Sequence, residues 1–239
     1  MKREETNYQE IEAAARCLGF DLFGTAALPD LAELAPDLSA ATTARLQSGI
    51  SLGVFLSRGV LEDIGEHPTR LYLHHYRQAN YFLDRNAFIL ARRIEALGAR
   101  ALPVAATQTI DWNVQRGHLS HKEVARRAGL GWIGRNNLLV TPARGAQVRL
   151  VTVLTDLPLT TDRPHPGDCG DCRRCLDTCP AGAIGEKAED FDHRQCYRQL
   201  QVFKNSLNLG HYICGVCVRA CRGEGSETGS SAGSDPGRR

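Results

Sequence analysis

The spacing of the cysteines constrains this chain more than any other feature of its sequence. Residues 169–180 read CGDCRRCLDTC-P, a C-x2-C-x2-C-x3-C-P pattern, and a second group of cysteines ends in a C-x2-C-x3-C spacing. Three thiolates within seven residues can surround one corner of a 4Fe–4S cluster, whereas the fourth thiol of such a run points to a neighbouring cluster. The spacing therefore predicts two 4Fe–4S clusters rather than disulfides, as suits a reducing compartment.

The same pattern predicts how the cysteines divide between two clusters. One cluster should be held by Cys169, Cys172, Cys175 and Cys221. The other should be held by Cys179, Cys196, Cys214 and Cys217. Two structural zinc sites are the alternative, but such sites usually combine two separated C-x2-C pairs. The remaining cysteine, Cys17, is expected to be a small buried side chain.

Hydrophobic periodicity predicts an α/β or α+β domain over residues 1–160. Helices are expected over residues 7–18 and 70–97, and the second has one apolar stripe with Gly98 as its C-terminal cap. Strands are expected at FDLFGTAAL, ISLGVFLS, ARALPVAA, NLLV and QVRLVTVLTD. A further helix should open at Ser120, with a capping box to Glu123. Because helices and strands alternate, we expect a mixed sheet.

Composition points to a globular protein with a second, metal-organised unit. The chain of 239 residues has 29 Lys and Arg against 27 Asp and Glu, which gives no sign of a nucleic-acid-coating surface. Residues 161–222 form the expected metal-organised unit, and the Gly/Ser-rich residues 223–239 are expected to be disordered. The charged N-terminus and the lack of a long apolar run predict a cytoplasmic protein without a membrane segment.

The stretch AGLGWIGRNN has the formal spacing G-x-G-x-x-G. A dinucleotide site needs a strand before this motif and a helix after it, but here a helix precedes it and a strand follows. The glycines should instead form a tight turn that lets the backbone approach a flat or bulky group, or a turn without any ligand. The candidate cofactor-binding residues are Gly129, Gly131, Trp132, Gly134, Arg135 and Asn136.

A longer stretch, SHKEVARRAGLGWIGRNNLLVTPARG, followed by VRLVTVLTDLPL and the cysteine run, resembles the epoxyqueuosine reductases and their relatives, the reductive dehalogenases. The resemblance extends from about Gly19 to Cys221. It implies a nitroreductase-like domain at residues 1–160 that binds cobalamin, and a ferredoxin-like domain with two 4Fe–4S clusters at residues 161–222. It also implies that electrons pass from the clusters to the cobalt, where the substrate is reduced.

One position departs from the pattern of the tRNA-modifying reductases. Those enzymes carry a proton-donating aspartate ahead of the glycine turn, and an alignment without gaps places Gln115 there. A neutral amide cannot deliver a proton as a carboxylic acid can, and Asp111 could substitute only if the loop differs. His121 lies either near the corrinoid or substrate, or on a solvated helix start. The candidate catalytic residues are Asp111, Gln115 and His121.

The residues and the resemblance together predict an iron–sulfur oxidoreductase that is corrinoid-dependent and reduces a small molecule. Its expected electron donor is a low-potential protein of the ferredoxin or flavodoxin type. Because Gln115 replaces the aspartate and no helical-repeat extension follows the clusters, tRNA is not expected as a partner. Two alternatives stay open: a cofactor-free electron-transfer protein that activates a partner, and an epoxyqueuosine reductase that acts on tRNA.

Overall fold

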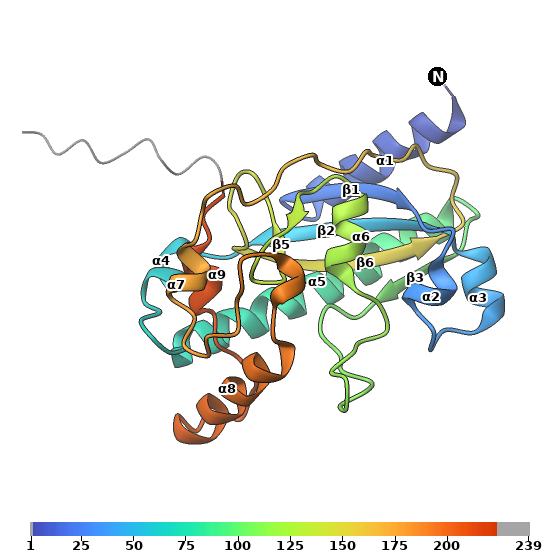
Figure 1. The fold of residues 1–239 in the computed structure, drawn as a ribbon. Coiled ribbons are helices and arrows are strands. Elements are labelled where there is room, and N and C mark those ends of the chain that lie inside the picture. Colours follow the sequence, from blue (N-terminus) through green and yellow to red (C-terminus); the bar gives the residue numbers. More distant parts are fainter. Residues whose placement is uncertain (1, 224–239) are drawn as a thin grey trace, which may run out of the picture.

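A four-stranded sheet forms the centre of the computed structural model, which describes residues 2–223 and so leaves the expected tail outside it apart from its first residue. The strands, in the spatial order β1-β2-β6-β3, are β1 (Leu22–Ala27), β2 (Ser48–Phe55), β6 (Val148–Thr155) and β3 (Ala101–Val104). Helices α1 (Arg3–Cys17) and α5 (Arg70–Ala96) cover one face, and α6 (His121–Arg127) covers the other (Figure 1).

Each strand pair of this sheet is antiparallel, so the mixed α/β architecture is confirmed but the mixed sheet is wrong. Strands β2 and β3 run in the same direction and are joined through α5, as in a parallel crossover. Strand β6 comes later in the chain and inserts between them, antiparallel to both. The alternation of strand, helix and strand in the sequence therefore reflects the crossover from β2 through α5 to β3. Because β6 lies between these two strands, β2 and β3 each pair with β6 and not with each other.

Helix α5 confirms the long amphipathic helix expected at residues 70–97. The Tyr72 N–H donates to the Thr69 hydroxyl at 3.1 Å, which caps the first turn, and Gly98 ends the helix with φ +85°. Leu90 and Ile94 belong to its buried stripe, which packs in the main core. Along residues 2–223, no helix has both the length and the apolar character that crossing a membrane requires.

Helix α6 lies close to the sheet because two strand positions beneath it are glycines. A Cβ atom on Gly24 in β1 would be 2.4 Å from the carbonyl oxygen of Ala128, and one on Gly49 in β2 would be 2.9 Å from a methyl group of Val124. Both distances are shorter than van der Waals contact, so a side chain at either position would displace α6. The glycines thus place the start of α6 and the turn after it against the sheet.

The start of α6 agrees with the prediction, but the capping box is wrong. Ser120 is the N-cap residue, yet its side chain makes no cap hydrogen bond. Glu123 instead accepts hydrogen bonds from Arg126 at 2.7 Å and Arg127 at 2.8 Å. The Arg126 hydrogen bonds are the largest cause of the lowered pKa of the Glu123 carboxyl. Charge-assisted bonds are stronger than neutral ones, so the carboxylate turns to the arginines.

The remaining helices and strands of residues 2–223 lie before and after residue 160. Before residue 160 these are α2 (Leu31–Leu34), α3 (Ala40–Arg45), α4 (Arg58–Glu62), β4 (Trp132–Ile133) and β5 (Leu139–Val140). After it come α7 (Arg174–Asp177), the 3-10 turn η1 (Ala188–Asp190), α8 (His193–Ser206) and α9 (Val216–Ala220). Leu209, Ile213 and Val216 from this last part join the main core of the sheet domain. The domain boundary near residue 160 stays a prediction.

Candidate functional site

The first group of thiols lies where α7 and α9 pack against each other. Burial, followed by the nearby Cys221, Cys169 and Cys172, raises the pKa of the Cys175 thiol to about 11. Cys221 therefore lies beside the first three cysteines of the run, although 46 residues separate it from Cys175. This group consists of Cys169, Cys172, Cys175 and Cys221.

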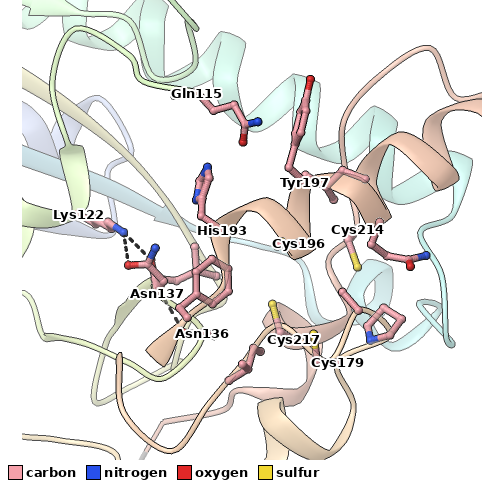
Figure 2. A pocket seen from close by; sticks show the side chains of 17 residues that line it. Gln115, Lys122, Asn136, Asn137, Cys179, His193, Cys196, Tyr197, Cys214 and Cys217 are labelled. Carbon is pink, nitrogen blue, oxygen red and sulfur yellow. Dashed lines mark hydrogen bonds between the residues drawn. The ribbon is translucent and has the colours of Figure 1, made fainter. Parts of the chain in front are cut away.

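The second group of thiols lies between α8 and α9. Burial is the main cause of the strongly raised pKa of Cys217. The neighbouring Cys214, Cys196 and Cys179 raise it further, and Cys175 of the first group adds a weaker contribution. Cys179 thus faces the second group, although it closes the first run in the sequence. The four thiols Cys179, Cys196, Cys214 and Cys217 line one cavity of about 300 Å³ (Figure 2).

The side chains of neither thiol group converge closely enough to surround a single metal ion. Among residues 2–223, no three His, Cys, Asp or Glu side chains lie close enough together to hold a single metal ion. The ninth cysteine, Cys17, is exposed at the end of α1, so the expectation of a buried side chain is wrong. The buried face of that helix is formed instead by Ile11, Ala14 and Ala15.

The cavity at the second thiol group is mostly apolar, with polar side chains at one side. Its apolar lining includes Leu138, Pro180, Ala181, Ile184, Phe191 and Leu200. Its polar lining is Gln115, Lys122, Asn136, Asn137, His193, Tyr197 and Gln199, without a carboxylate. A cavity of about 160 Å³ adjoins it at Lys122 and Leu138, and a third of about 180 Å³ adjoins that one at Ala106 and His121. We call this row of three cavities the groove.

Lys122 stands between the first two cavities of the groove. Its ammonium group donates to the backbone carbonyl of Asn137 at 2.8 Å and to the Asn137 side-chain oxygen at 2.5 Å (Figure 2). Burial lowers the pKa of this ammonium. Asn137 has φ +57°, a conformation that asparagine adopts more readily than most residues. The lysine therefore ties α6 to the turn between β4 and β5.

His121 lines the second and third cavities and has both ring nitrogens occupied. Nδ1 lies 2.9 Å from the Thr152 hydroxyl, and Nε2 lies 2.9 Å from the Ala105 carbonyl oxygen. Since a carbonyl oxygen can only accept, Nε2 carries the proton, and Nδ1 accepts from Thr152. Burial lowers the pKa of His121 to about 4, so the ring is neutral at pH 7. These contacts anchor α6 to β6, and the catalytic role stays a prediction.

The neutral His121 predicts a loss of stability in mild acid. An unfolded histidine takes up a proton below about pH 6.5, whereas the folded ring resists protonation down to about pH 4. The stability that depends on the neutral ring is complete above pH 6.5 and is lost as the pH falls towards 4. The total loss should approach about 3 kcal/mol. Denaturant unfolding between pH 4 and 8 should show a weaker pH dependence of the unfolding free energy for His121→Gln than for the wild-type chain.

The loop between β3 and α6 brings Gln115, rather than Asp111, to the groove. Asp111 pairs with Arg116 through two backbone hydrogen bonds, and its carboxylate accepts the N–H of Asn113 at 2.8 Å within the same turn. Gln115 adopts φ +52° and lines the first cavity, where Figure 2 shows its amide pointing towards His193. The roles of both residues in catalysis stay predictions.

The glycine turn contacts the protein's own backbone. A Cβ atom would lie 2.5 Å from the Arg163 carbonyl oxygen at Gly129, and 2.0 Å from the Val140 carbonyl oxygen at Gly131. At Gly134 it would lie 2.5 Å from a methyl group of Val140. At Gly131 and Gly134, the backbone thus closely approaches Val140 of the β4–β5 hairpin, where a flat or bulky group had been expected.

Two other candidates from this stretch lie at the first thiol group. Trp132 packs near Cys169 and Cys221. The Arg135 guanidinium donates to four carbonyl oxygens, those of Glu186 at 2.6 Å, Cys172 at 2.7 Å, Gly170 at 2.8 Å and Cys169 at 3.5 Å. Of the six candidate cofactor-binding residues, Asn136 is the one that lines the first cavity of the groove.

Sequence reasoning missed several polar residues of this cavity, among them His193 and Tyr197. His193 and Tyr197 lie on α8 together with Cys196, three residues before it and one residue after it. Positions three and four apart share one face of a helix, so His193 shares a face with both Cys196 and Tyr197. The spacing of His193, Cys196 and Tyr197 in HRQCY could have indicated that these side chains lie together. It predicts a site only once Cys196 is known to face a cavity.

Comparison with known proteins finds relatives named epoxyqueuosine reductase. The protein of Bacillus cereus is 31% identical over 141 residues, covering 56% of this chain and 37% of the relative. That of Listeria monocytogenes is 44% identical over 116 residues, covering 45% and 30%, and that of Synechocystis is 36% identical over 143 residues, covering 56% and 49%. The chain therefore spans less than half the length of these curated relatives. No protein-family model matches the chain.

Solved structures with the same fold include both expected classes of protein. A reductive dehalogenase, whose structure suggests a mechanism for B12-dependent dehalogenation, has a TM-score of 0.71 at 19% identity, covering 92% of this chain and 32% of its own. The epoxyqueuosine reductase of Streptococcus thermophilus has a TM-score of 0.58 at 21% identity, covering 89% and 65%. Together with the sequence relatives, these confirm the resemblance to the superfamily.

One further match corrects an expectation. An epoxyqueuosine reductase in complex with an epoxyqueuosine-modified tRNA-Tyr stem loop has a TM-score of 0.59 at 21% identity, covering 90% of this chain and 64% of its own. The sequence relatives carry the same enzyme name. The expectation that tRNA is not a partner rested on Gln115 and on the extent of the chain, and these comparisons count against it.

Proposed function

We propose that this chain is an iron–sulfur reductase that holds two 4Fe–4S clusters and a corrinoid. The observation that carries the proposal is the first cavity of the groove, where four thiols face polar side chains across an apolar space. The two thiol groups would each hold one cluster, as the spacing predicts. When bound, the clusters supply one-electron transfer, and the corrinoid supplies the reducing chemistry that protein side chains lack.

The residues present fit clusters better than zinc. Four zinc ligands converge on one ion at about 2.3 Å, whereas the cysteines of a 4Fe–4S centre surround a larger cubane. The spacing of Cys169, Cys172 and Cys175, three thiols in one short run, therefore supports clusters. The raised pKa values of Cys175 and Cys196, both about 11 through burial, mean that cluster assembly displaces protons from these thiols.

The positions of the two groups support a direction for electron flow. Cys172 of the first group is exposed, which gives an electron donor of the ferredoxin or flavodoxin type access to that side. The second group lines the groove instead. We propose that electrons enter at the first group and leave at the second.

The groove also fits a corrinoid. Its three adjoining cavities run from the second thiol group to the residues around His118, and none of them has a carboxylate in its lining. The buried Nδ1 atom of His118 lines the third cavity and lacks a hydrogen-bond partner. A ligand rich in amide groups, as a corrinoid is, would satisfy such an atom.

Reduction of a substrate needs protons as well as electrons. Besides the thiols, the titratable side chains at the first cavity are Lys122, His193 and Tyr197. Lys122 is engaged with Asn137, while the imidazole of His193 has one nitrogen that can donate a proton and one that can accept it. Gln115 has no acidic proton to deliver, so its role at the cavity would be to orient the substrate by hydrogen bonds.

Metal analysis of the anaerobically reconstituted chain tests this proposal. After addition of cobalamin and removal of the excess, we expect about eight irons and one cobalt per chain. Eight irons without cobalt would favour the cofactor-free electron-transfer protein instead, and the search would turn to its redox partner. A chain that retains two zinc ions and no iron would contradict both readings.

An epoxyqueuosine reductase acting on tRNA is the second candidate, and the names of the sequence relatives favour it. Incubating the loaded chain with an epoxyqueuosine-modified stem loop and a low-potential reductant would decide between substrates. Formation of queuosine, detected by mass spectrometry of the digested RNA, would establish the tRNA reading. If epoxyqueuosine stayed unchanged under conditions in which the cobalt is reduced, the tRNA candidate would be contradicted. The proposal of a small-molecule substrate would then be favoured.

A further inference from the structure

Asn136 carries a buried hydrogen-bond donor that the protein itself does not use. Its side chain is 3% exposed, and its Nδ2 atom lacks a partner among residues 2–223. Its Oδ1 atom accepts the Leu138 N–H at 3.3 Å. A flipped carboxamide would set two donors against each other, so this contact fixes which end of the group is the free donor.

The turn that carries Asn136 is held from two sides. Lys122 bonds to Asn137 on one side, and Arg135 bonds to the carbonyl oxygens of the cysteine-bearing segment on the other. Within the turn, the Asn137 N–H donates to the Gly134 carbonyl oxygen at 2.8 Å. A donor on so constrained a turn has little freedom to find another partner, and leaving it unpaired costs free energy.

The first cavity offers the place for the missing acceptor. Asn136 lines it together with the four thiols of the second group. Since no described residue accepts a hydrogen bond from Nδ2, the acceptor belongs to a group that fills the cavity. The sulfurs of a 4Fe–4S cluster accept hydrogen bonds from amides.

We propose that the Asn136 carboxamide donates a hydrogen bond to a sulfur atom of the second cluster and thereby raises the reduction potential of that cluster. The inference rests on the proposed function, because it requires a cluster at Cys179, Cys196, Cys214 and Cys217. A hydrogen-bond donor stabilises the extra negative charge of the reduced state. Asn136 is thus a positioning residue that makes the second cluster the better electron acceptor.

The test is a redox titration of the reconstituted full chain, followed by electron paramagnetic resonance. Asn136→Leu removes the donor at nearly constant volume, and we expect the second cluster to become about tenfold harder to reduce, which equals about 59 mV for one electron. Asn136→Asp keeps the acceptor for Leu138 but replaces the donor by a negative charge, so its shift should be larger. Cys196→Ser, which removes a ligand of the second cluster, identifies the signal that belongs to it.

A control variant separates a local hydrogen bond from a general charge effect. Asn205 is exposed on α8, the helix that also carries Cys196, and Asn205→Asp should leave both potentials unchanged. Equal potentials in wild type and in Asn136→Leu, or a shift confined to the first cluster, would overturn the inference. A wild-type chain that binds no iron would instead refute the proposed function and the inference with it. If Asn136→Leu fails to assemble clusters, Asn136→Ala, which also removes the donor and adds no charge, decides.

Discussion

Replacing Cys179 by serine should remove the cluster that Cys217 holds, and not the one held by its sequence neighbours. Cys179 lies beside Cys196 and Cys214 in the fold, although it is four residues from Cys175. We expect iron to fall from about eight to about four per chain, with the same remaining resonance signal as in Cys217→Ser. Cys221→Ser should leave the opposite signal, identical to that of Cys175→Ser.

The exposed Cys17 supplies the matched control, because Cys17→Ser should keep about eight irons. Iron content and resonance spectra of the five variants are the measurements. If Cys179→Ser and Cys175→Ser lost the same signal, the division into two groups would be wrong. Each loss should also lower the melting temperature, because metal binding to buried thiols is coupled to folding.

Replacing Gly131 by alanine should destabilise the chain by about 3 kcal/mol or more. Gly131 has φ +154°, and a Cβ atom there would lie 2.0 Å from the Val140 carbonyl oxygen and 3.2 Å from the Thr141 Cα. Both neighbours are backbone atoms of the paired strand, so they cannot move aside as a flexible side chain can. The β4–β5 hairpin would have to open, which would displace Trp132 from the first thiol group.

Gly98 is the control for this substitution, because it also has a positive φ, +85°, but a Cβ atom there meets nothing within 4 Å. Gly98→Ala should therefore show only the left-handed backbone penalty of about 1–2 kcal/mol. Denaturant unfolding gives the free energies, and iron analysis reports on the first cluster. Equal stability of the two variants would mean that the hairpin adapts and that the contact with Val140 is not decisive.

Local chemistry explains why several elements could be predicted. Helix α5 is recognisable because its apolar residues recur every three or four positions between a threonine cap and Gly98. The division of the cysteines between two clusters stays a prediction, although Cys221 does lie near Cys175 and Cys179 does lie near Cys217. The reversed context of the glycine motif likewise identified it as a turn after a helix.

Other features depend on partners that the local sequence does not contain. The sheet is antiparallel because β6, from residues 148–155, inserts between β2 and β3. The Glu123 carboxylate binds Arg126 and Arg127 and does not form the expected capping box. Cys17 is exposed because the buried face of α1 is formed by other residues. Short-range patterns cannot predict any of these contacts.

The sequence by itself determined the spacing of the cysteines and the main helices and strands. The tertiary structure alone decided that Gln115 and Asn136 lie at one cavity with the second thiol group, and that Trp132 and Arg135 lie at the first. The physical reason is the distance along the chain between the residues that are in contact. Spacing along the chain governs contacts within one or two turns. The first cavity instead collects side chains from several separate segments, which come together only when α6, α8, α9 and the hairpin pack in the fold.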